Sequence, residues 1–566
     1  MPVSALRYEP RVDLQSRNLA EGQSDVTVRG GTFENTGFRV GALTVGDPQT
    51  GHYLAELPIA PAMLGAPEVA TGASLFLAAT NATVGAIVQE WRPIRNAGAA
   101  VAVAGESQLR RAELYQGRRW GGEGAAVRWA GDLALATSES DGPLPGGDHE
   151  FFRGNLRLQR QDGGAQTDAL AGYQAKRFGW PNLYTPFNSS ELENLQTTLW
   201  VINHRVGQGA DGSVEMGAFH RRNKDDYAFN RFAPVGPVHP FQHTTWLSGA
   251  AAEVRRQWMG LEWEARGEVQ ADQLQSTSLT AGRYMSRSLA RGALAVRNEW
   301  ATDTAGGRGS VRVGVGYDDT NRGGGAVTPL LEFGRTFSAA GLRRFRFGYA
   351  KSTQVPSYTA LNSSAVSGLF RGNRDLGRSA SHNLEVAVEG SLDHWALEAA
   401  AFFRRDRSLV DWTFRRGVVA RTANAVDVDT AGLELVARRS WTVLDLVLGY
   451  TALDKDPSYR GAAVDASFYA LNYARHRLTL AAVARLGGGV ELRIDNAARW
   501  QAENLLRTQG GRQALNSSVG LVVRPRGWPG WEFTARVDNV WDDPYQEVPA
   551  VPASPRQWSV GLGYAW

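Results

Sequence analysis

The feature of this 566-residue sequence that most constrains its fold is a repeated alternation of apolar and charged residues. In 384–389 (LEVAVE), Leu384 and Val386 alternate with Glu385, and a β-strand points such neighbours to opposite faces. A similar period of two returns in 395–403, 444–450, 490–495 and 531–538. The pattern therefore predicts strands with one apolar and one polar face.

Both a soluble β-sandwich and a membrane β-barrel alternate in this way. Here the polar face repeatedly carries Glu, Arg and Asp at strand centres, whereas the apolar face ends in Trp, Tyr or Phe. A polar lumen and interfacial aromatic girdles have this arrangement. No window holds about 18 consecutive apolar residues, which excludes a transmembrane helix but not a barrel. The pattern favours a transmembrane β-barrel over a soluble β-protein.

The connections between these segments alternate in length. Short turns such as 391–394 interleave with long polar links such as 454–475, as in outer-membrane barrels with short periplasmic turns and long external loops. Nine strands fit between 383 and the last residue, or about 20 residues per strand with its link. At this spacing, and with the even number that antiparallel closure prefers, a barrel over 94–566 holds about 22 strands.

Residues 1–93 have a different character, because glycine, proline and short apolar pieces follow one another without a sustained period. A barrel of about 22 strands leaks unless its lumen is filled. We therefore expect an all-β transmembrane barrel over 94–566 with a small plug domain, 1–93, in its lumen.

Several motifs, taken in order, resemble those of TonB-dependent outer-membrane receptors over nearly the whole chain. The plug motifs are Arg29-Gly30-Gly31, Glu68-Val69 with Gly72, and Asn81-Ala82 with Gly85. The barrel motifs are 349–361 (YAKSTQVPSYTAL), 429–439 (DTAGLELVARR) and 535–548 (ARVDNVWDDPYQEV). The segment 47–59 (DPQTGHYLAELPI) resembles a cobalamin-receptor-like subgroup. The sequence is identified as a member of this family.

The resemblance implies active uptake of a scarce nutrient, such as cobalamin, an iron chelate or an oligosaccharide, bound between extracellular loops and plug apex. It implies the TonB complex, outer-membrane lipid and the barrel assembly machinery as partners of a monomer. The cations are scattered, which argues against nucleic acid. The alternatives are a passive porin-like channel with a vestigial plug and a surface-binding protein.

The first residues, MPVSALRYEPRVDLQ, have neither the basic nor the apolar region of a signal peptide. The resemblance implies that a signal peptide, a TonB box and the first part of the plug precede Arg29, which has only 28 residues before it. We expect an outer-membrane protein whose sequence has a wrongly assigned or trimmed start, rather than a natural loss.

A turn-rich plug segment is the candidate ligand-binding site, because polar groups beside an aromatic ring suit a small molecule. Its residues are Asp47, Gln49, Thr50, His52 and Tyr53. The resemblance places them toward the external apex of the plug. The alternative is a structural turn that begins at Asp-Pro.

Two barrel glutamates, Glu385 and Glu434, face the predicted lumen by parity. The resemblance implies that such glutamates pair with plug arginines, and we expect Arg29 to pair with one or both, because a buried charge needs a partner. The alternative is that both glutamates are solvated lumen residues.

Nothing in the sequence indicates an enzyme, a cofactor or a metal site. No G-x-S-x-G, H-E-x-x-H or Walker pattern occurs, and the chain has no cysteine. His220, His239 and His243 lie near one another in the sequence, but without a carboxylate at ligand spacing we interpret them as loop histidines.

The chain ends in a strand pattern, 556–566 (RQWSVGLGYAW), whose apolar face also resembles an outer-membrane assembly signal. That face consists of Trp558, Val560, Leu562, Tyr564 and Trp566. A barrel has no free edge, so we expect this strand to pair with the first one.

Overall fold

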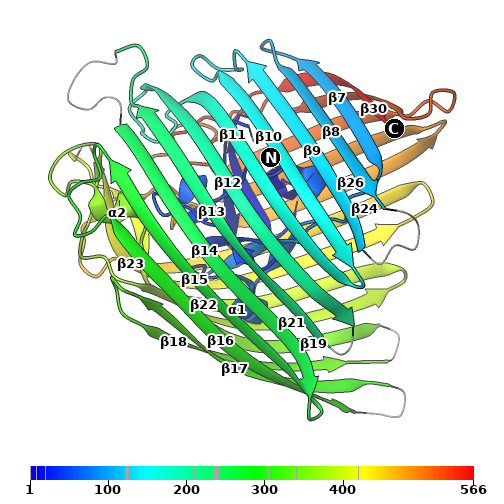
Figure 1. The fold of residues 1–566 in the computed structure, drawn as a ribbon. Coiled ribbons are helices and arrows are strands. Elements are labelled where there is room, and N and C mark those ends of the chain that lie inside the picture. The colour runs from blue at the N-terminus through cyan, green and yellow to red at the C-terminus, as the bar shows by residue number, and fades with distance from the viewer. Residues whose placement is uncertain are drawn as a thin grey trace.

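The computed structural model describes residues 2–7, 9–18, 21–121, 127–209, 212–233, 241–302, 306–338, 341–418 and 420–566. Strands β7 to β30 form one closed barrel, in which β30 pairs with β7 (Figure 1). Two of these strands, β20 (Phe370–Arg371) and β25 (Ala466–Ser467), have only two residues, which leaves 22 long strands in the described wall. The predicted closed antiparallel barrel is confirmed. No helix in these ranges is long and apolar enough to cross a membrane.

The first long strands follow one another as antiparallel neighbours. They are β7 (Ala97–Gly105), β8 (Arg110–Trp120), β9 (Val127–Ser140), β10 (His149–Asp162), β11 (Ala165–Pro181), β12 (Ser190–Gly209), β13 (Gly212–Ala228), β14 (Phe241–Trp258), β15 (Leu261–Ser276), β16 (Ser286–Ala301), β17 (Arg308–Thr320), β18 (Ala326–Thr336) and β19 (Leu342–Gln354). The remaining long strands are β21 (Ser379–Leu392), β22 (Trp395–Phe414), β23 (Arg421–Ser440), β24 (Leu444–Ser458), β26 (Ala474–Gly487), β27 (Val490–Gln501), β28 (Gln513–Val523), β29 (Trp531–Asp538) and β30 (Gln557–Ala565).

The connections alternate between tight turns and long links. Between β21 and β22, Asp393 and His394 both have positive φ, 49° and 70°, and form a two-residue hairpin turn. The following long links include 459–473, which contains β25, and 539–556. A helix, α2 (Tyr358–Asn362), lies in the long link after β19. The long links therefore gather at one end of the barrel.

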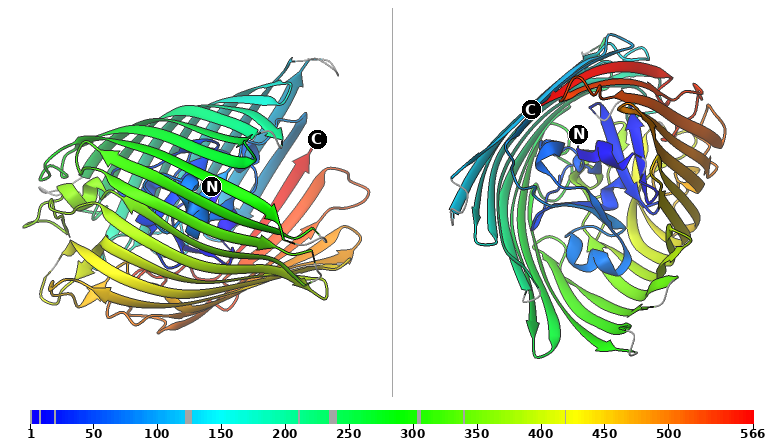
Figure 2. Two further views of the ribbon diagram at one scale, coloured as in Figure 1. Left: turned by 90° about the horizontal axis from the view of Figure 1, so that it is seen from below. Right: turned by 90° about the vertical axis from the view of Figure 1, so that its right-hand side faces the viewer.

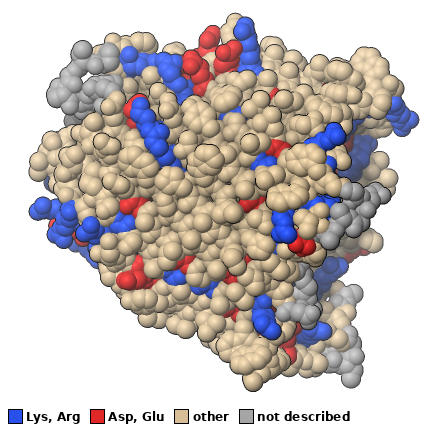
Figure 3. All heavy atoms as spheres, in the orientation of Figure 1, with Lys and Arg blue, Asp and Glu red and all other residues tan. Residues whose placement is uncertain are grey.

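The wall strands have the predicted faces. On β21, Leu384 and Val386 are each 40% exposed on the outer face, whereas Glu385, which faces the lumen, is 9% exposed. On the side of the molecule shown in Figure 3, uncharged side chains cover most of the outer face, and charged ones gather mainly toward its margins. The outer surface is thus an apolar band suited to lipid.

The described residues between 2 and 94, here called the plug, lie inside the barrel (Figure 2). A hairpin, β1 (Val12–Arg17) with β2 (Gln23–Val28), precedes a four-stranded sheet of order β4-β3-β6-β5, in which β3 and β6 run parallel. The sheet strands are β3 (Thr36–Val40), β4 (Leu43–Thr44), β5 (Glu68–Ala70) and β6 (Gly85–Gln89). The plug has one short α-helix, α1 (Leu75–Ala78). Its 3-10 turns are Pro2–Leu6, Phe33–Asn35, Gly51–Tyr53, Pro61–Met63 and Gly72–Ser74. The first barrel strand begins at Ala97, and the domain boundary after 93 stays a prediction.

One hydrophobic core joins the plug to the wall. Plug residues Val40, Leu43 and Ile59 belong to the same buried cluster as Leu199 and Phe219 of the wall. The inner face of β10 to β14 is therefore partly apolar, whereas the sequence pattern predicted a polar lumen. The reason is that this part of the wall packs against the plug rather than against water.

Candidate ligand-binding site

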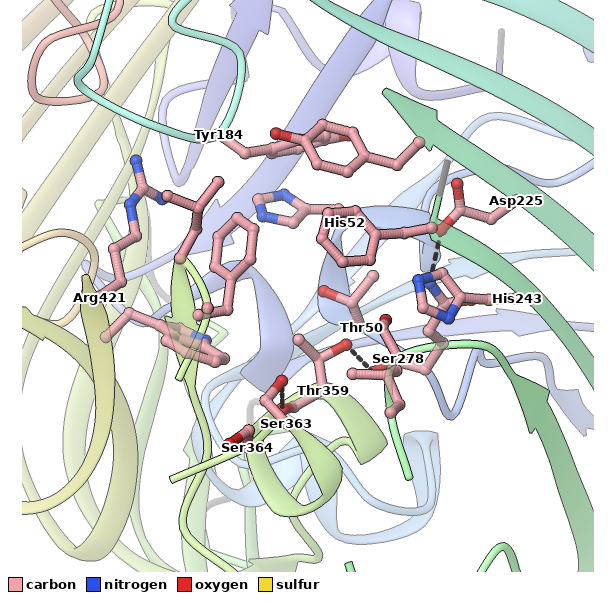
Figure 4. Close-up of a pocket in the computed structure, with 18 of the residues that line it drawn as sticks. Thr50, His52, Tyr184, Asp225, His243, Ser278, Thr359, Ser363, Ser364 and Arg421 are labelled. Carbon is pink, nitrogen blue, oxygen red and sulfur yellow. Dashed lines mark hydrogen bonds between the residues drawn. The ribbon is translucent and has the colours of Figure 1, made fainter. Parts of the chain in front are cut away.

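A cavity of about 530 Å³ lies between the plug and the barrel end that carries the long links. Plug residues Gln49, Thr50, His52 and Tyr53 line it, together with residues of β12, β13 and β14 and of the links after β15 and β19. This volume is within the range of small-molecule sites. Figure 4 shows His52 and Thr50 from the plug beside Asp225 from the wall and Tyr184 and Thr359 from links.

The plug segment 47–53 owes its shape to a local turn. Asp47 Oδ1 accepts a hydrogen bond from the backbone N–H of Gln49 at 2.9 Å, and the 3-10 turn Gly51–Tyr53 follows. A Cβ at Gly51 would lie 2.7 Å from the Glu34 Cα, so only glycine fits there. Of the five predicted ligand-binding residues, four line the cavity. Asp47 does not; its Oδ2 lies 3.6 Å from Arg221 Nη2.

His52 is fixed on three sides. Its ring stacks on Phe33 at 4.2 Å between centroids, and its Nδ1 lies 2.9 Å from Asp25 Oδ1. Asp25 in turn pairs with Arg17 at 2.9 Å. Burial lowers the pKa of His52, while the adjacent Asp25 carboxylate opposes the change. The neutral ring, which donates from Nδ1 to Asp25, presents Nε2 toward Tyr469 Oη at 3.4 Å.

The wall contributes two carboxylates and a cation that sequence reasoning missed. Glu193 on β12 and Asp225 on β13 line one side, and Gln49 Nε2 donates to Asp225 Oδ2 at 2.6 Å. Arg421 lies across the cavity from Asp225 (Figure 4), and its guanidinium lies 3.6 Å from the centre of the Phe468 ring. Aromatic rings fill much of the remaining lining. Alternation alone gives the inward face of each strand, but not which inward residue reaches the height of the cavity.

The interpretation of the histidines as loop residues is wrong for two of them. His243 lies on β14, lines the cavity, and has its Nδ1 2.8 Å from Ser276 Oγ. His220 lies on β13 with its Nδ1 2.8 Å from Ser248 Oγ, and His239 is outside the described residues. The wall strands β13 and β14 are longer than a membrane crossing requires. Their ends therefore include residues that the sequence pattern indicated as loop.

The structure brings Arg29, Glu385 and Glu434 together at the plug–barrel boundary. Arg29 Nη1 lies 2.5 Å from Glu385 Oε2, and Arg29 Nη2 lies 2.7 Å from Glu434 Oε2. All three side chains are buried, and Arg404 Nη1 donates to the Arg29 carbonyl at 3.1 Å. The two glutamates are therefore enclosed rather than solvated.

The C-terminal strand closes the wall. The side chains of Trp558, Val560, Leu562, Tyr564 and Trp566 are exposed on the outer face. Trp566 exchanges two backbone hydrogen bonds with Gly98, at 2.9 and 3.0 Å, and its indole Nε1 donates to Gln116 Oε1 at 2.9 Å. The indole leaves no room for a side chain at Gly98.

Glu34, a half-buried carboxyl beside Gly51 of the plug turn, should make the stability of the plug depend on pH. Burial raises the pKa of Glu34 to about 7 from an ordinary 4.5, although hydrogen bonds from Ser357 and Gly51 oppose the rise. A carboxyl group with a raised folded-state pKa contributes stability below its unfolded pKa, and this contribution is lost as pH rises through about 7. We expect Glu34→Gln to remove a destabilisation of up to about 3 kcal/mol at mildly alkaline pH.

Thermal melting at mildly acidic and mildly alkaline pH measures this effect. The native chain should melt lower at alkaline pH, and the difference should shrink in Glu34→Gln but persist in Glu68→Gln, which alters an exposed plug glutamate. An unchanged difference in Glu34→Gln would contradict the assignment.

The closed barrel with its enclosed plug is the fold of outer-membrane receptors and transporters. The sequence matches the family described as "TonB dependent receptor-like, beta-barrel" over residues 115–540, and the chain belongs to this TonB-dependent receptor family. No curated protein matches the sequence. The assignment to a cobalamin-receptor-like subgroup stays a prediction.

Several solved structures share the fold at low sequence identity. The siderophore receptor PirA from Pseudomonas aeruginosa is 14% identical with a TM-score of 0.70, over 98% of this chain and 99% of that one. The FrpB iron transporter from Neisseria meningitidis is 11% identical with a TM-score of 0.76, over 100% and 96%. The copper transporter OprC is 12% identical with a TM-score of 0.78, over 100% and 98%.

Proposed function

We propose that the protein takes up a small, scarce nutrient by TonB-dependent active transport, with the nutrient bound in the cavity at the plug apex. The observation that carries the proposal is the cavity itself, which joins four plug residues to the wall and to the long links. A ligand held there contacts both the part that must move and the part that stays fixed. Ligand binding can therefore bias the plug between conformations.

A metal chelate is the ligand class that the similar structures favour, since PirA is named as a siderophore receptor and FrpB as an iron transporter. Cobalamin and an oligosaccharide remain alternatives that also suit an aromatic, hydrogen-bonding cavity. We further propose a monomer, because the closed wall has no free strand edge. Its partners are outer-membrane lipid on the apolar band and the assembly machinery at the C-terminal strand.

Passive conduction is the less favoured alternative. The plug shares a buried core with the wall and is tied to it by the Arg29 ion pairs. A steady current through the native protein in lipid bilayers would favour the channel over the transporter.

Filling the cavity should abolish uptake without unfolding the barrel. Thr50→Trp places an indole in the cavity from the plug side, and we expect at least about a tenfold loss of ligand binding. The measurement is energy-dependent accumulation of iron from a set of ferric chelates, in iron-starved cells that carry the complete gene. Thr198→Trp, on the lipid-facing side of β12, is the matched control and should transport normally. Equal uptake by both variants would contradict the proposed binding site, and no iron uptake by native cells would contradict the metal-chelate class.

A further inference from the structure

We propose that the cavity selects ligands that carry a positively charged ammonium or amidinium group, attracted by the paired carboxylates of Glu193 and Asp225. This inference rests on the proposed function only in taking the cavity as the ligand site. It concerns the charge that the site recognises.

Glu193 carries the argument, because it is a buried carboxylate with no cation paired to it among the described residues. Its side chain lines the cavity, yet the residue has 0% exposure and neither Oε1 nor Oε2 has a hydrogen-bond partner among the described residues. The Asp225 carboxyl and the Tyr53 and Tyr184 hydroxyls interact with it, and none of these groups carries a positive charge. A buried carboxylate with no cation beside it is costly unless a cation or a proton compensates it.

Asp225 adds a second negative charge to the same side of the cavity. Gln49 satisfies its Oδ2, but its Oδ1 has no hydrogen-bond partner. Within the described ranges, no lysine or arginine forms a salt bridge with Glu193 or Asp225. The adjacent Lys224 pairs instead with Asp226 at 2.9 Å. Burial and the negative charges of Asp225 and Glu193 raise the pKa of the Tyr53 phenol well above its ordinary value.

A neighbouring glutamate shows that burial on this strand does not by itself leave a carboxylate unsatisfied. Glu191, two residues before Glu193, accepts hydrogen bonds from the backbone of Tyr184 at 2.8 Å, the backbone of Thr185 at 3.0 Å and the Tyr227 hydroxyl at 2.8 Å. Glu191 does not line the cavity. The unsatisfied pair therefore coincides with the cavity.

Aromatic faces complete a site for an organic cation. Tyr184, Tyr227 and Phe241 line the cavity near the carboxylates, and aromatic rings attract cations through their faces. The low-dielectric surroundings strengthen the attraction of the carboxylates behind them. Arg421, the one arginine or lysine among the described lining residues, lies across the cavity from Asp225 and donates to Tyr469 Oη at 2.8 Å (Figure 4). A cationic group is thus directed to the Glu193–Asp225 side.

Binding of three probes that share one skeleton tests the inference. The probes are 2-phenylethylammonium, 2-phenylethanol and 3-phenylpropionate. Each is titrated into the purified protein near neutral pH, and binding is measured by calorimetry and by tryptophan fluorescence. Fluorescence can report binding because Trp412 lines the cavity. We expect the ammonium to bind at least about tenfold more tightly than the alcohol, and the carboxylate more weakly than either. The double variant Glu193→Gln/Asp225→Asn should bind ammonium and alcohol about equally.

Asp226→Asn is the matched control. It removes the carboxylate of the residue that follows Asp225, on the other face of β13, and should keep the preference for the ammonium probe. The mobility shift between unheated and heated samples on gels verifies that each variant is a folded barrel. Equal binding of ammonium and alcohol by the native protein, a preference that survives in the double variant, or no ammonium binding up to about 10 mM would overturn the inference.

The two proposals fail separately. If uptake is lost in Thr50→Trp but the native protein shows no charge preference, the charge inference is wrong and the transport proposal stands. If the charge preference depends on Glu193 and Asp225 but cells show no energy-dependent uptake, the transport proposal is wrong and the cation site stands.

Discussion

Replacing Arg29 with alanine should free the plug from the barrel at a much lower urea concentration than the native chain requires. Among the described residues, Arg29 is the one cation that forms ion pairs with Glu385 and Glu434, at 2.5 and 2.7 Å, and all three are buried. Its removal leaves two neighbouring buried carboxylates without a direct ion pair. Breaking a buried ion pair in this way costs about 3–5 kcal/mol. The measurement is protease sensitivity of residues 2–94 during urea titration, while the barrel stays folded on unheated gels.

Neutralising Arg29, Glu385 and Glu434 together separates the effect of their charges on stability from the effect of their packing. The triple variant Arg29→Met/Glu385→Gln/Glu434→Gln keeps similar volumes and should recover much of the lost stability, because no charge is left unpaired. Arg29→Lys should lie between the native chain and Arg29→Ala, since lysine lacks the fork that contacts both glutamates. If Arg29→Ala released the plug at the native urea concentration, the ion pairs would not hold it.

Deleting Trp566 should reduce the amount of folded barrel in the outer membrane by at least about tenfold. The deletion removes both backbone hydrogen bonds to Gly98 and the indole contact with Gln116, where the last strand joins the first. An unpaired strand end in lipid is strongly unfavourable, because no water satisfies its backbone. Immunoblotting of unheated outer-membrane fractions measures the folded form.

Trp566→Phe is the control for this deletion. It keeps the backbone pairing with Gly98 and an aromatic ring at the membrane interface, so its folded yield should stay close to native. Normal assembly after deletion would show that the preceding pairs of β30, from Ser559 to Ala565, suffice to close the wall.

The barrel could be predicted from the sequence because its signal is local. A period of two fixes which residues face inward, so the inward positions of Glu385 and Glu434 followed from their neighbours alone. Nine long strands were expected after residue 383, and β21 to β30 contain nine besides β25. The contact of Arg29 with residues more than 350 positions away needed the resemblance to a family as well.

The plug residues that line the cavity could be predicted from the sequence, but the wall residues could not. Which wall residues line the cavity depends on their height along the barrel axis. Gln49, Thr50, His52 and Tyr53 come from one continuous turn whose composition indicates binding. Glu193, Asp225 and Arg421 come from separate strands, and strand tilt and stagger decide which inward residue meets the plug apex. Parity does not encode that stagger. For the same reason, the sequence did not predict the apolar inner face near Leu199 and Phe219. This face is apolar because the plug packs against it.

The antiparallel β1–β2 hairpin gives the plug a graded mechanical resistance. Val12 pairs with Val28 at the end where the hairpin joins Arg29, so tension on the N-terminal side separates one residue pair at a time toward Arg17 and Gln23. The parallel pairs between β3 and β6 are loaded together, in shear. Arg29 lies between these two regions and is held by Glu385 and Glu434. A pulling force therefore opens the hairpin pair by pair, against the Asp13–Arg499 and Arg17–Asp25 ion pairs, before it reaches Arg29.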